Sequence, residues 1–230
     1  MKRIVIVTLL AASLCGNALG MNYLGPPTTK MQAGQWAIGG SYADSRQDVE
    51  IDGGILFDDL KERIGLGRVA VGLVTSRAEI CGLFGAAELH EDGFETDTQI
   101  LGGLGGRITA QPGKVLSWGI VGQFTWFHTE DTSAILGVVQ PYELDMQEVQ
   151  IGLGPCWRPG PFVLYGGPMI QWLGGDIETP LLGKRDVNIE SWLGGYVGGG
   201  FELDKQLMVT AEFQVTPDAL GWGVGAQLRF

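Results

Sequence analysis

The sequence lacks the features that mark a helical membrane protein or a nucleic-acid-binding protein. After residue 20 no run of 18 uninterrupted apolar residues occurs, which excludes membrane-spanning helices. Lys and Arg number only 15 against 26 Asp and Glu, giving a formal net charge of -11. The clustered cations that phosphate binding needs are therefore missing, and nucleic acid is excluded as a partner.

Cysteine is also scarce, with three in the whole chain. Cys15 could suggest a lipid anchor, but the bulky Leu14 before it fits such a processing signal poorly. Cys81 and Cys156 are too few for a disulfide scaffold. Two buried unbridged thiols are favoured over a bridge, although the bridge stays open.

The first residues have the pattern of a cleavable signal peptide. Lys2 and Arg3 form its charged start, residues 4–14 its apolar stretch, and residues 18–20 a cleavage site of small residues. The mature chain is then expected to begin near Met21. The signal peptide is thus expected over 1–20, and the rest of the chain divides into a short segment over 21–33 and one domain over 34–230.

What the sequence does have is alternation of apolar residues with small or polar ones, which indicates β-strands. The last segment shows it best. One face carries Leu220, Trp222, Val224, Ala226, Leu228 and Phe230, and the other carries Gly221, Gly223, Gly225, Gln227 and Arg229. The same test predicts about ten strands, at 34–45, 63–74, 77–89, 97–110, 115–128, 146–157, 161–173, 188–203, 206–216 and 219–230.

The connections between these strands alternate in length, as in a barrel with one tight and one open side. Tight turns are expected at 75–76, 111–114, 158–160 and 204–205, and longer loops at 46–62, 90–96, 129–145 and 174–187. This order places both ends of the mature chain on the same, periplasmic side, which makes residues 21–33 a periplasmic lead-in and residues 34–230 one barrel domain. Pro168 implies a bulge, or it puts the strand at 161–173 in doubt, because proline cannot donate to a ladder.

The non-apolar face of these strands is mostly Gly, Ala, Ser, Thr and Gln, which is poor cover for a water-facing surface. Trp118 and Trp126 lie eight residues apart on one face, about 20 Å of depth in a strand tilted by about 40°. The sequence thus predicts an all-β fold, a closed up-and-down antiparallel transmembrane β-barrel of about ten strands, with eight or twelve possible and a soluble secreted β-sandwich as the alternative. The aromatic residues expected to face lipid are Trp36, Trp118, Phe124, Trp126, Phe162, Trp172, Phe213, Trp222 and Phe230.

Charged residues of both signs fall on the inner face. In a barrel of about ten strands the interior is narrow, so these charges are expected to pair across it and plug it, with a narrow pore as the other possibility. No motif for a cofactor or a bound metal is present. The charges assigned to the lumen are Arg68, Glu79, Arg107, Glu148, Glu202, Glu212 and Arg229.

The last strand, with Val224, Ala226, Leu228 and the terminal Phe230 on one face, resembles that of small outer-membrane β-barrel proteins. The resemblance implies a place in the cell outer membrane, contact with lipid and lipopolysaccharide, and recognition by the barrel assembly machinery through the strand ending at Phe230. A structural, surface-interaction or narrow-pore role is the functional expectation.

An enzymatic alternative comes from His90 and His128, which stand beside acidic residues at expected outer strand ends. Outer-membrane proteases and lipid A deacylases place a histidine at this rim. The acidic and serine patterns that accompany it in those enzymes are missing here, so a surface hydrolase is the lesser expectation.

Overall fold

The computed structural model describes residues 21–230 except 52–54, 74–76, 92–93, 96–97, 136–137, 181–182, 189–191 and 205. Across these residues the chain is built of strands, and none of it forms a helix long and apolar enough to cross a bilayer. The strands are β1 (Trp36–Ile51), β2 (Ile55–Gly72), β3 (Ala78–Glu91), β4 (Phe94–Glu95), β5 (Gln99–Gln111), β6 (Leu116–Ile135), β7 (Val138–Trp157), β8 (Phe162–Thr179), β9 (Gly183–Asn188), β10 (Leu193–Glu202), β11 (Leu207–Val215) and β12 (Ala219–Arg229).

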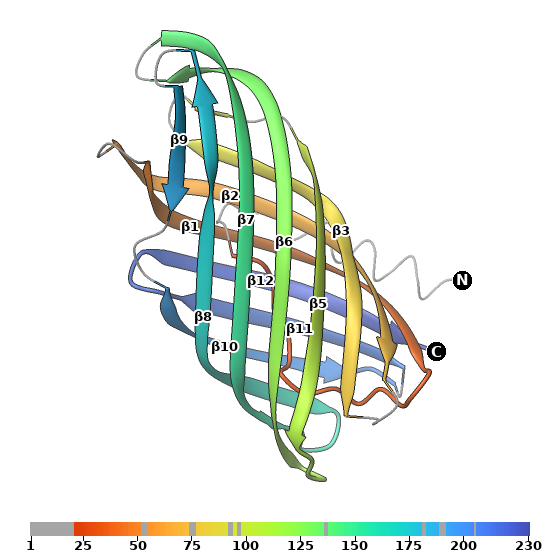
Figure 1. The fold of residues 1–230 in the computed structure, drawn as a ribbon. Helices are drawn as coiled ribbons and strands as arrows, with labels where there is room; N and C mark the ends of the chain where they lie inside the picture. Colours follow the sequence, from red (N-terminus) through yellow and green to blue (C-terminus); the bar gives the residue numbers. More distant parts are fainter. Residues whose placement is uncertain are drawn as a thin grey trace.

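The sheet closes on itself, as Figure 1 shows. Neighbouring strands pair antiparallel in chain order, β12 pairs with β1, and β10 pairs with β8, which completes a ring of ten. The ring leaves out β4, which pairs with β3, and β9. Closure confirms the barrel predicted from alternation and excludes the β-sandwich, because a sandwich keeps two separate sheets.

The strands differ greatly in length. We call the end where β1 begins and β12 ends the proximal end, and the opposite one the distal end. β6 and β7 have 20 residues each, whereas β10 has 10, so the long strands continue about ten residues beyond the short ones. Ten residues correspond to roughly 30 Å along a strand. Figure 1 shows β6, β7 and β8 rising past β10, β11 and β12.

β9 continues the barrel wall on the distal side of the short strands β10, β11 and β12. It pairs with the distal part of β8 over its whole length and with the tip of β1 at two positions. We call the distal parts of β1, β2, β6, β7 and β8, together with β9, the distal extension. The loops predicted at 46–62, 129–145 and 174–187 are therefore corrected, since most of their residues are strand.

Pro168 does not produce a bulge. β7 and β8 pair from Glu143 to Gly152 and again at Cys156 and Trp157, in one unchanged register. Pro155 and Pro168 lie in the unpaired interval between these two stretches, and β8 is held there by β10 on its other side. A missing donor on each strand thus interrupts the ladder without shifting it.

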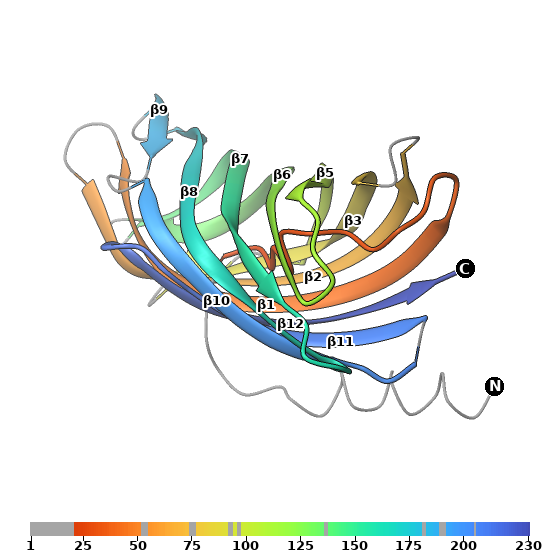
Figure 2. The same cartoon turned by 90° about the horizontal axis from the view of Figure 1, so that it is seen from below.

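The predicted periplasmic lead-in lies inside the barrel. Met21, Leu24 and Met31 are at most 1 % exposed, and Figure 2 shows this part of the chain within the curve of the strands. Its polar groups bond to side chains from several strands, as described below. The reason is the width of the ring, because ten strands of mainly small inner residues leave room for one extended chain.

Candidate functional site

The amino-terminal segment, residues 21–32, is held in the proximal interior by hydrogen bonds to the wall. Asn22 Nδ2 donates to Thr125 Oγ1 at 2.9 Å and to the Glu148 carboxylate. The backbone N–H groups of Leu24 and Gly25 each donate to Glu212 at 3.0 Å. Buried backbone donors need such partners, and here the wall supplies them.

Further along the segment, Thr29 provides two more links to the wall. Its hydroxyl donates to the Glu79 carboxylate, and its backbone N–H donates to Thr109 Oγ1 at 3.1 Å. Five strands of the ring, β3, β5, β6, β7 and β11, are thus tied to one internal chain. The segment closes the proximal interior as an extra element of the packed core.

Glycines on the inner wall make space for the segment. A Cβ on Gly119 would lie 2.3 Å from the Pro27 carbonyl oxygen, and one on Gly225 would lie 2.7 Å from the Tyr23 ring. At either distance the Cβ of any residue other than glycine would clash with the amino-terminal segment. The high glycine content of the interior therefore has a specific cause at these positions.

Two arginines and one carboxylate form the main charged group of the interior. Arg68 Nη2 lies 2.6 Å from Glu79 Oε1, and Arg107 Nη1 lies 3.6 Å from the same oxygen. Arg107 also donates to the Leu24 carbonyl at 3.2 Å, so the segment shares in compensating the extra positive charge. Buried charges are tolerated when paired and hydrogen-bonded in this way.

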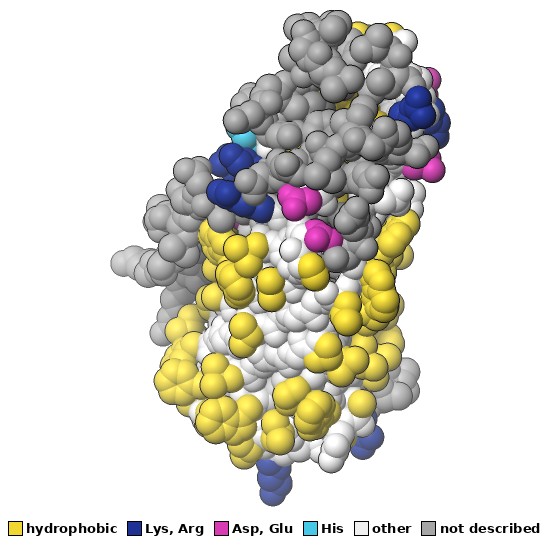
Figure 3. Space-filling model, turned by 90° about the vertical axis from the view of Figure 1, so that its left-hand side faces the viewer, with side chains coloured by type: hydrophobic (Ala, Val, Ile, Leu, Met, Phe, Trp, Pro, Cys, Tyr) yellow, Lys and Arg dark blue, Asp and Glu magenta, His cyan; other side chains and the backbone are white. Residues whose placement is uncertain are grey.

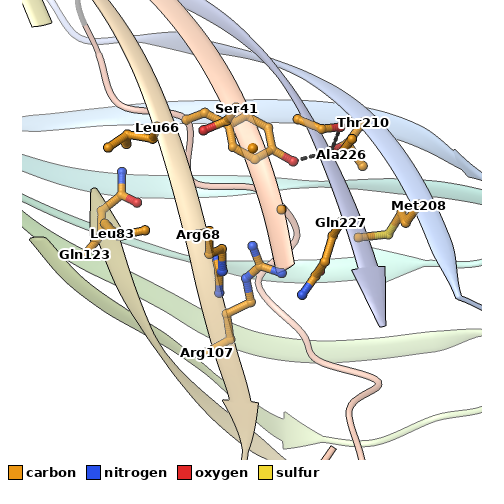
Figure 4. A pocket seen from close by; sticks show the side chains of 14 residues that line it. Ser41, Leu66, Arg68, Leu83, Arg107, Gln123, Met208, Thr210, Ala226 and Gln227 are labelled. Carbon is orange, nitrogen blue, oxygen red and sulfur yellow. Dashed lines mark hydrogen bonds between the residues drawn. The ribbon is translucent and has the colours of Figure 1, made fainter. Parts of the chain in front are cut away.

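Beside this group lies a cavity of about 30 Å³, which is room for one or two water molecules. In Figure 4 the guanidinium groups of Arg68 and Arg107 lie close together, with Gln227 across from them. The Tyr23 hydroxyl bonds to Thr210 on the far side of the same cavity. A space of this size is too small for a molecule much larger than water.

A second charged group closes the proximal mouth around Glu202. The Lys30 ammonium lies 2.8 Å from Glu202 Oε1, and the guanidinium groups of Arg229 and Arg158 lie at 3.8 and 4.0 Å. Arg158 also donates to Thr28 Oγ1 at 2.8 Å. The amino-terminal segment therefore contributes a residue to this group as well.

The seven charges assigned to the lumen all lie on the inner wall, but they pair differently from the expectation. Glu79 meets Arg68 and Arg107 from neighbouring strands, and Glu202 meets Arg229. Among the described residues Glu148 and Glu212 form no ion pair with an arginine, and both bind the amino-terminal segment. The carboxylates of Glu148 and Glu212 thus accept N–H groups of the segment instead of pairing with an arginine across the lumen.

Several interior residues were not found from the sequence. Lys30 and Asn22 belong to the segment that was placed outside the barrel, and Arg158 was assigned to a turn. Glu62, which is 3 % exposed, falls in the part of β2 that was assigned to a loop. Cys81 and Cys156 are buried and not bridged.

The outer wall carries the aromatic residues. All nine that were expected to face lipid lie on the outer face, exposed or half-exposed, and Phe84, Trp157 and Trp192 join them. Figure 3 shows hydrophobic side chains over the wall and charged ones at its two ends. Exposed apolar area on this scale is not found on ordinary soluble monomers.

In the distal extension the two faces exchange character. On β7 the outward residues change from Ile151 and Val149 to Asp145 and Glu143. The inward ones change from Gln150 and Glu148 to Met146, Leu144 and Tyr142, all buried. On β6 the outward Trp126 is likewise followed by His128 and Glu130, while Phe127 points inward. The strands are thus apolar outside in their proximal part and apolar inside in their distal part.

The exposed side of the distal extension is acidic around His128. His128 Nδ1 lies 2.8 Å from Asp145 Oδ1, and its Nε2 lies 3.6 Å from Glu130 Oε1. The hydrogen bond to Asp145 raises the pKa of His128, which outweighs the small opposing effect of burial. His128, Glu130 and Glu143 offer ligand atoms within 4.8 Å of one another, but all three are exposed, and acidic surface groups often stand this close without an ion.

The two histidines do not lie together in one site. His90 lies on β3 and His128 on β6, with β5 between these strands, and both side chains are exposed. The partners that are recorded for His128 are carboxylates. This is the arrangement of a surface ion pair rather than of a nucleophile with its base.

No family model matches the sequence, and no curated protein matches it significantly. Among solved structures, the attachment invasion locus protein Ail of Yersinia pestis is 16 % identical, with 86 % of this chain and 100 % of that one covered and a TM-score of 0.42. The outer membrane protease OmpT of Escherichia coli is 12 % identical, with 91 % and 99 % covered and a TM-score of 0.43. An outer membrane channel of Pseudomonas putida F1 is 12 % identical, with 91 % and 100 % covered and a TM-score of 0.49.

These structures include an adhesion protein, a protease and a channel, so they favour no single activity. With TM-scores below 0.5, the functional argument depends on the chain's own geometry. That geometry is a closed barrel with an apolar outer wall, a filled interior and a distal extension with reversed faces.

Proposed function

We propose that this chain is a non-conducting outer-membrane barrel that holds the distal extension at the cell surface as a surface-interaction element. The proximal end lies in the periplasm. The proximal strand parts cross the membrane, and the distal extension stands in water outside the cell.

The reversal of the two faces along β6 and β7 carries this proposal. A strand in hydrocarbon places apolar residues outward, whereas a strand in water places them inward. On β6 the change falls between Trp126 and His128, and Trp126 is the kind of residue that lies at a membrane interface. The eleven residues from Leu116 to Trp126, of which every second one faces outward, would therefore span the bilayer at the strand length that such barrels use.

The filled interior favours a closed barrel over a pore. The amino-terminal segment and its charged groups occupy the proximal part. Beyond them, the buried side chains of Leu101, Phe127, Leu144, Leu173 and Ile177 belong to one apolar cluster. Ions that entered from the proximal end would meet the amino-terminal segment, and ions that entered from the distal end would meet the apolar cluster. We call the segment and the cluster the two seals.

The expected partners follow from this placement. The apolar wall contacts outer-membrane lipid, and the exposed side of the distal extension faces lipopolysaccharide. The last strand, ending at Phe230, is the segment offered to the barrel assembly machinery. Its outward residues include Leu220, Val224 and Phe230, of which Phe230 is 61 % exposed.

Planar-bilayer recording on the purified refolded barrel tests the closed interior. We expect no steady channels, because both seals persist in the folded protein. Stepwise currents of uniform size would contradict the proposal and favour the narrow-pore role.

A charge on the outer wall tests the membrane placement. Leu104 is 62 % exposed in the middle of β5, and Leu104→Arg should cost about 2–4 kcal/mol in lipid if it lies near the midplane. Folding into lipid vesicles would be measured by heat-modifiable gel mobility. Leu104→Phe is the matched control and should fold normally, and an arginine variant that folds equally well would show that β5 does not face hydrocarbon.

A further inference from the structure

Two buried carboxylates in the interior have no cation near them among the described residues. Glu62 on β2 and Glu148 on β7 are 3 % and 5 % exposed, and they are close enough for the charge of Glu148 to act on Glu62. The side-chain amides of Asn22 and Gln171 donate to Glu148, the latter at 2.9 Å. An isolated pair of buried negative charges is costly unless a positive charge lies close by or the carboxyl groups take up protons.

The interior does contain cations, but they gather elsewhere. Arg68 and Arg107 surround Glu79, and Arg158, Arg229 and Lys30 surround Glu202 nearer the proximal mouth. No ion pair is recorded between any of these five and Glu62 or Glu148. A positive charge beside Glu62 and Glu148 would therefore have to come from another group.

The start of the described chain lies at this place. Both the side chain and the backbone N–H of Asn22 donate to Glu148. Neighbouring residues are about 3.8 Å apart, so the backbone nitrogen of Met21 lies within roughly 7 Å of this carboxylate. Met21 itself is 1 % exposed.

We propose that the missing cation is the α-ammonium group of Met21, created when the chain is cut between Gly20 and Met21. Water hydrolyses the Gly20–Met21 amide, the new carboxylate leaves with residues 1–20, and the nitrogen takes a proton to become an ammonium. In the uncut precursor that nitrogen is a neutral amide. Processing therefore supplies the charge that fixes the amino-terminal segment inside the barrel.

This inference uses the expected cleavage site and makes a further claim about it. Once the segment lies inside the barrel, the new terminus is a structural counter-ion and not only a product of export processing. It also gives cleavage a role in the order of assembly, because the segment reaches its full stability only after processing. The non-conducting role of the barrel does not depend on it.

The first experiment identifies the terminus. Intact-mass and amino-terminal analysis of the protein extracted from outer membranes should find Met21 as the first residue. A mature chain that begins elsewhere, or one that keeps residues 1–20, overturns the proposal.

The second experiment compares residues 21–230 with a free and with an acetylated α-amine, refolded in the same detergent. Acetylation should lower the folding equilibrium constant about tenfold or more, because it leaves buried carboxylates unpaired. In the Glu62→Gln/Glu148→Gln background the same modification should change it less than about twofold. Equal losses in both backgrounds overturn the proposal.

Glu212→Gln is the matched control. Glu212 binds the same segment, but at Leu24 and Gly25, which are further from the Met21 amine. The acetylation effect should survive in this variant. If it disappears there as well, the effect belongs to the segment in general and the proposal fails.

A labelling measurement keeps the test open if the double variant does not fold. In the folded native barrel an amine-reactive reagent should modify the Met21 amine at least about tenfold more slowly than in the urea-unfolded chain, as buried ion pairs are protected from solvent. Lys30, whose side chain is 39 % exposed, serves as the internal reference. Equal rates for the Met21 amine in the folded and unfolded states would overturn the inference.

Discussion

The proximal and distal parts of this barrel are filled by opposite chemistry. The proximal interior holds a hydrogen-bonded segment and two charged groups, and its wall is apolar on the outside. The distal interior is packed with apolar side chains such as Leu144 and Ile177, and its outer side is acidic. The difference indicates that the medium around a strand determines the chemistry of its inner face. Consecutive side chains point to opposite faces of the strand, so the residues that do not meet the outer medium must fill the interior.

Removing the amino-terminal segment should have the largest effect on the proximal part. Deletion of residues 21–31 discards the buried side chains of Met21, Leu24 and Met31 and removes the hydrogen bonds that the segment donates to Glu79 and Glu212. We expect a loss of more than about 5 kcal/mol in urea unfolding followed by tryptophan fluorescence. Gln32→Ala, at an exposed position, is the control. A deletion variant as stable as the parent would show that the segment does not pack in the interior.

Breaking the charged group around Glu79 should rank second. Glu79→Ala leaves Arg68 and Arg107 buried without their carboxylate, at a cost of about 3–5 kcal/mol. The same unfolding assay measures it. The control is Glu178→Ala on the exposed side of β8, where we expect less than about 1 kcal/mol. Similar effects of the two substitutions would remove the distinction between interior and surface charges.

A cavity in the distal interior should cost somewhat less and act independently. Leu144→Ala removes a 4 % exposed side chain from the apolar cluster, for about 2–4 kcal/mol. Combined with Glu79→Ala, its effect should add to within about 0.5 kcal/mol, because distant sites without shared partners are additive. Strong coupling in this double-mutant cycle would mean that the two parts form one cooperative network.

The smallest effect concerns the exposed pair on the distal extension. Since Asp145 raises the pKa of His128, their attraction is complete below the ordinary histidine pKa and is lost as the pH rises through the folded value. Nuclear magnetic resonance titration of His128 should give a pKa above 6.5, and Asp145→Asn should lower it. An unchanged value in that variant would show that the pair does not persist in solution.

The number of strands, their closure and their proximal parity could be predicted because alternation there keeps one phase. The distal extension was missed for the same reason. Tyr142, Leu144 and Met146 alternate cleanly with Glu143 and Asp145, but in the phase opposite to the rest of β7. A sequence analysis that expects apolar residues on the same face throughout a strand therefore ends the strand where the phase changes. It then assigns the rest of the strand to a loop.

The amino-terminal segment could not be placed from its own residues. It has two prolines and no alternation, which are typical of an exposed lead-in. Its signal lies in the wall instead, where Gly119 and Gly225 leave space that only an internal chain can fill. Glycine occurs in strands for several reasons. These two glycines therefore indicate an internal chain only once the register of the sheet shows that they face the interior.

Depth measurement along one face of β7 tests the reversal of faces most directly. A fluorescent label would be placed at Ile151 in one variant and at Asp145 in another, on a cysteine introduced into a background with Cys81 and Cys156 replaced by alanine. In lipid vesicles the label at 151 should be quenched by lipid-attached quenchers and the label at 145 by water-soluble ones. Equal quenching of both labels by the same quencher would contradict the account.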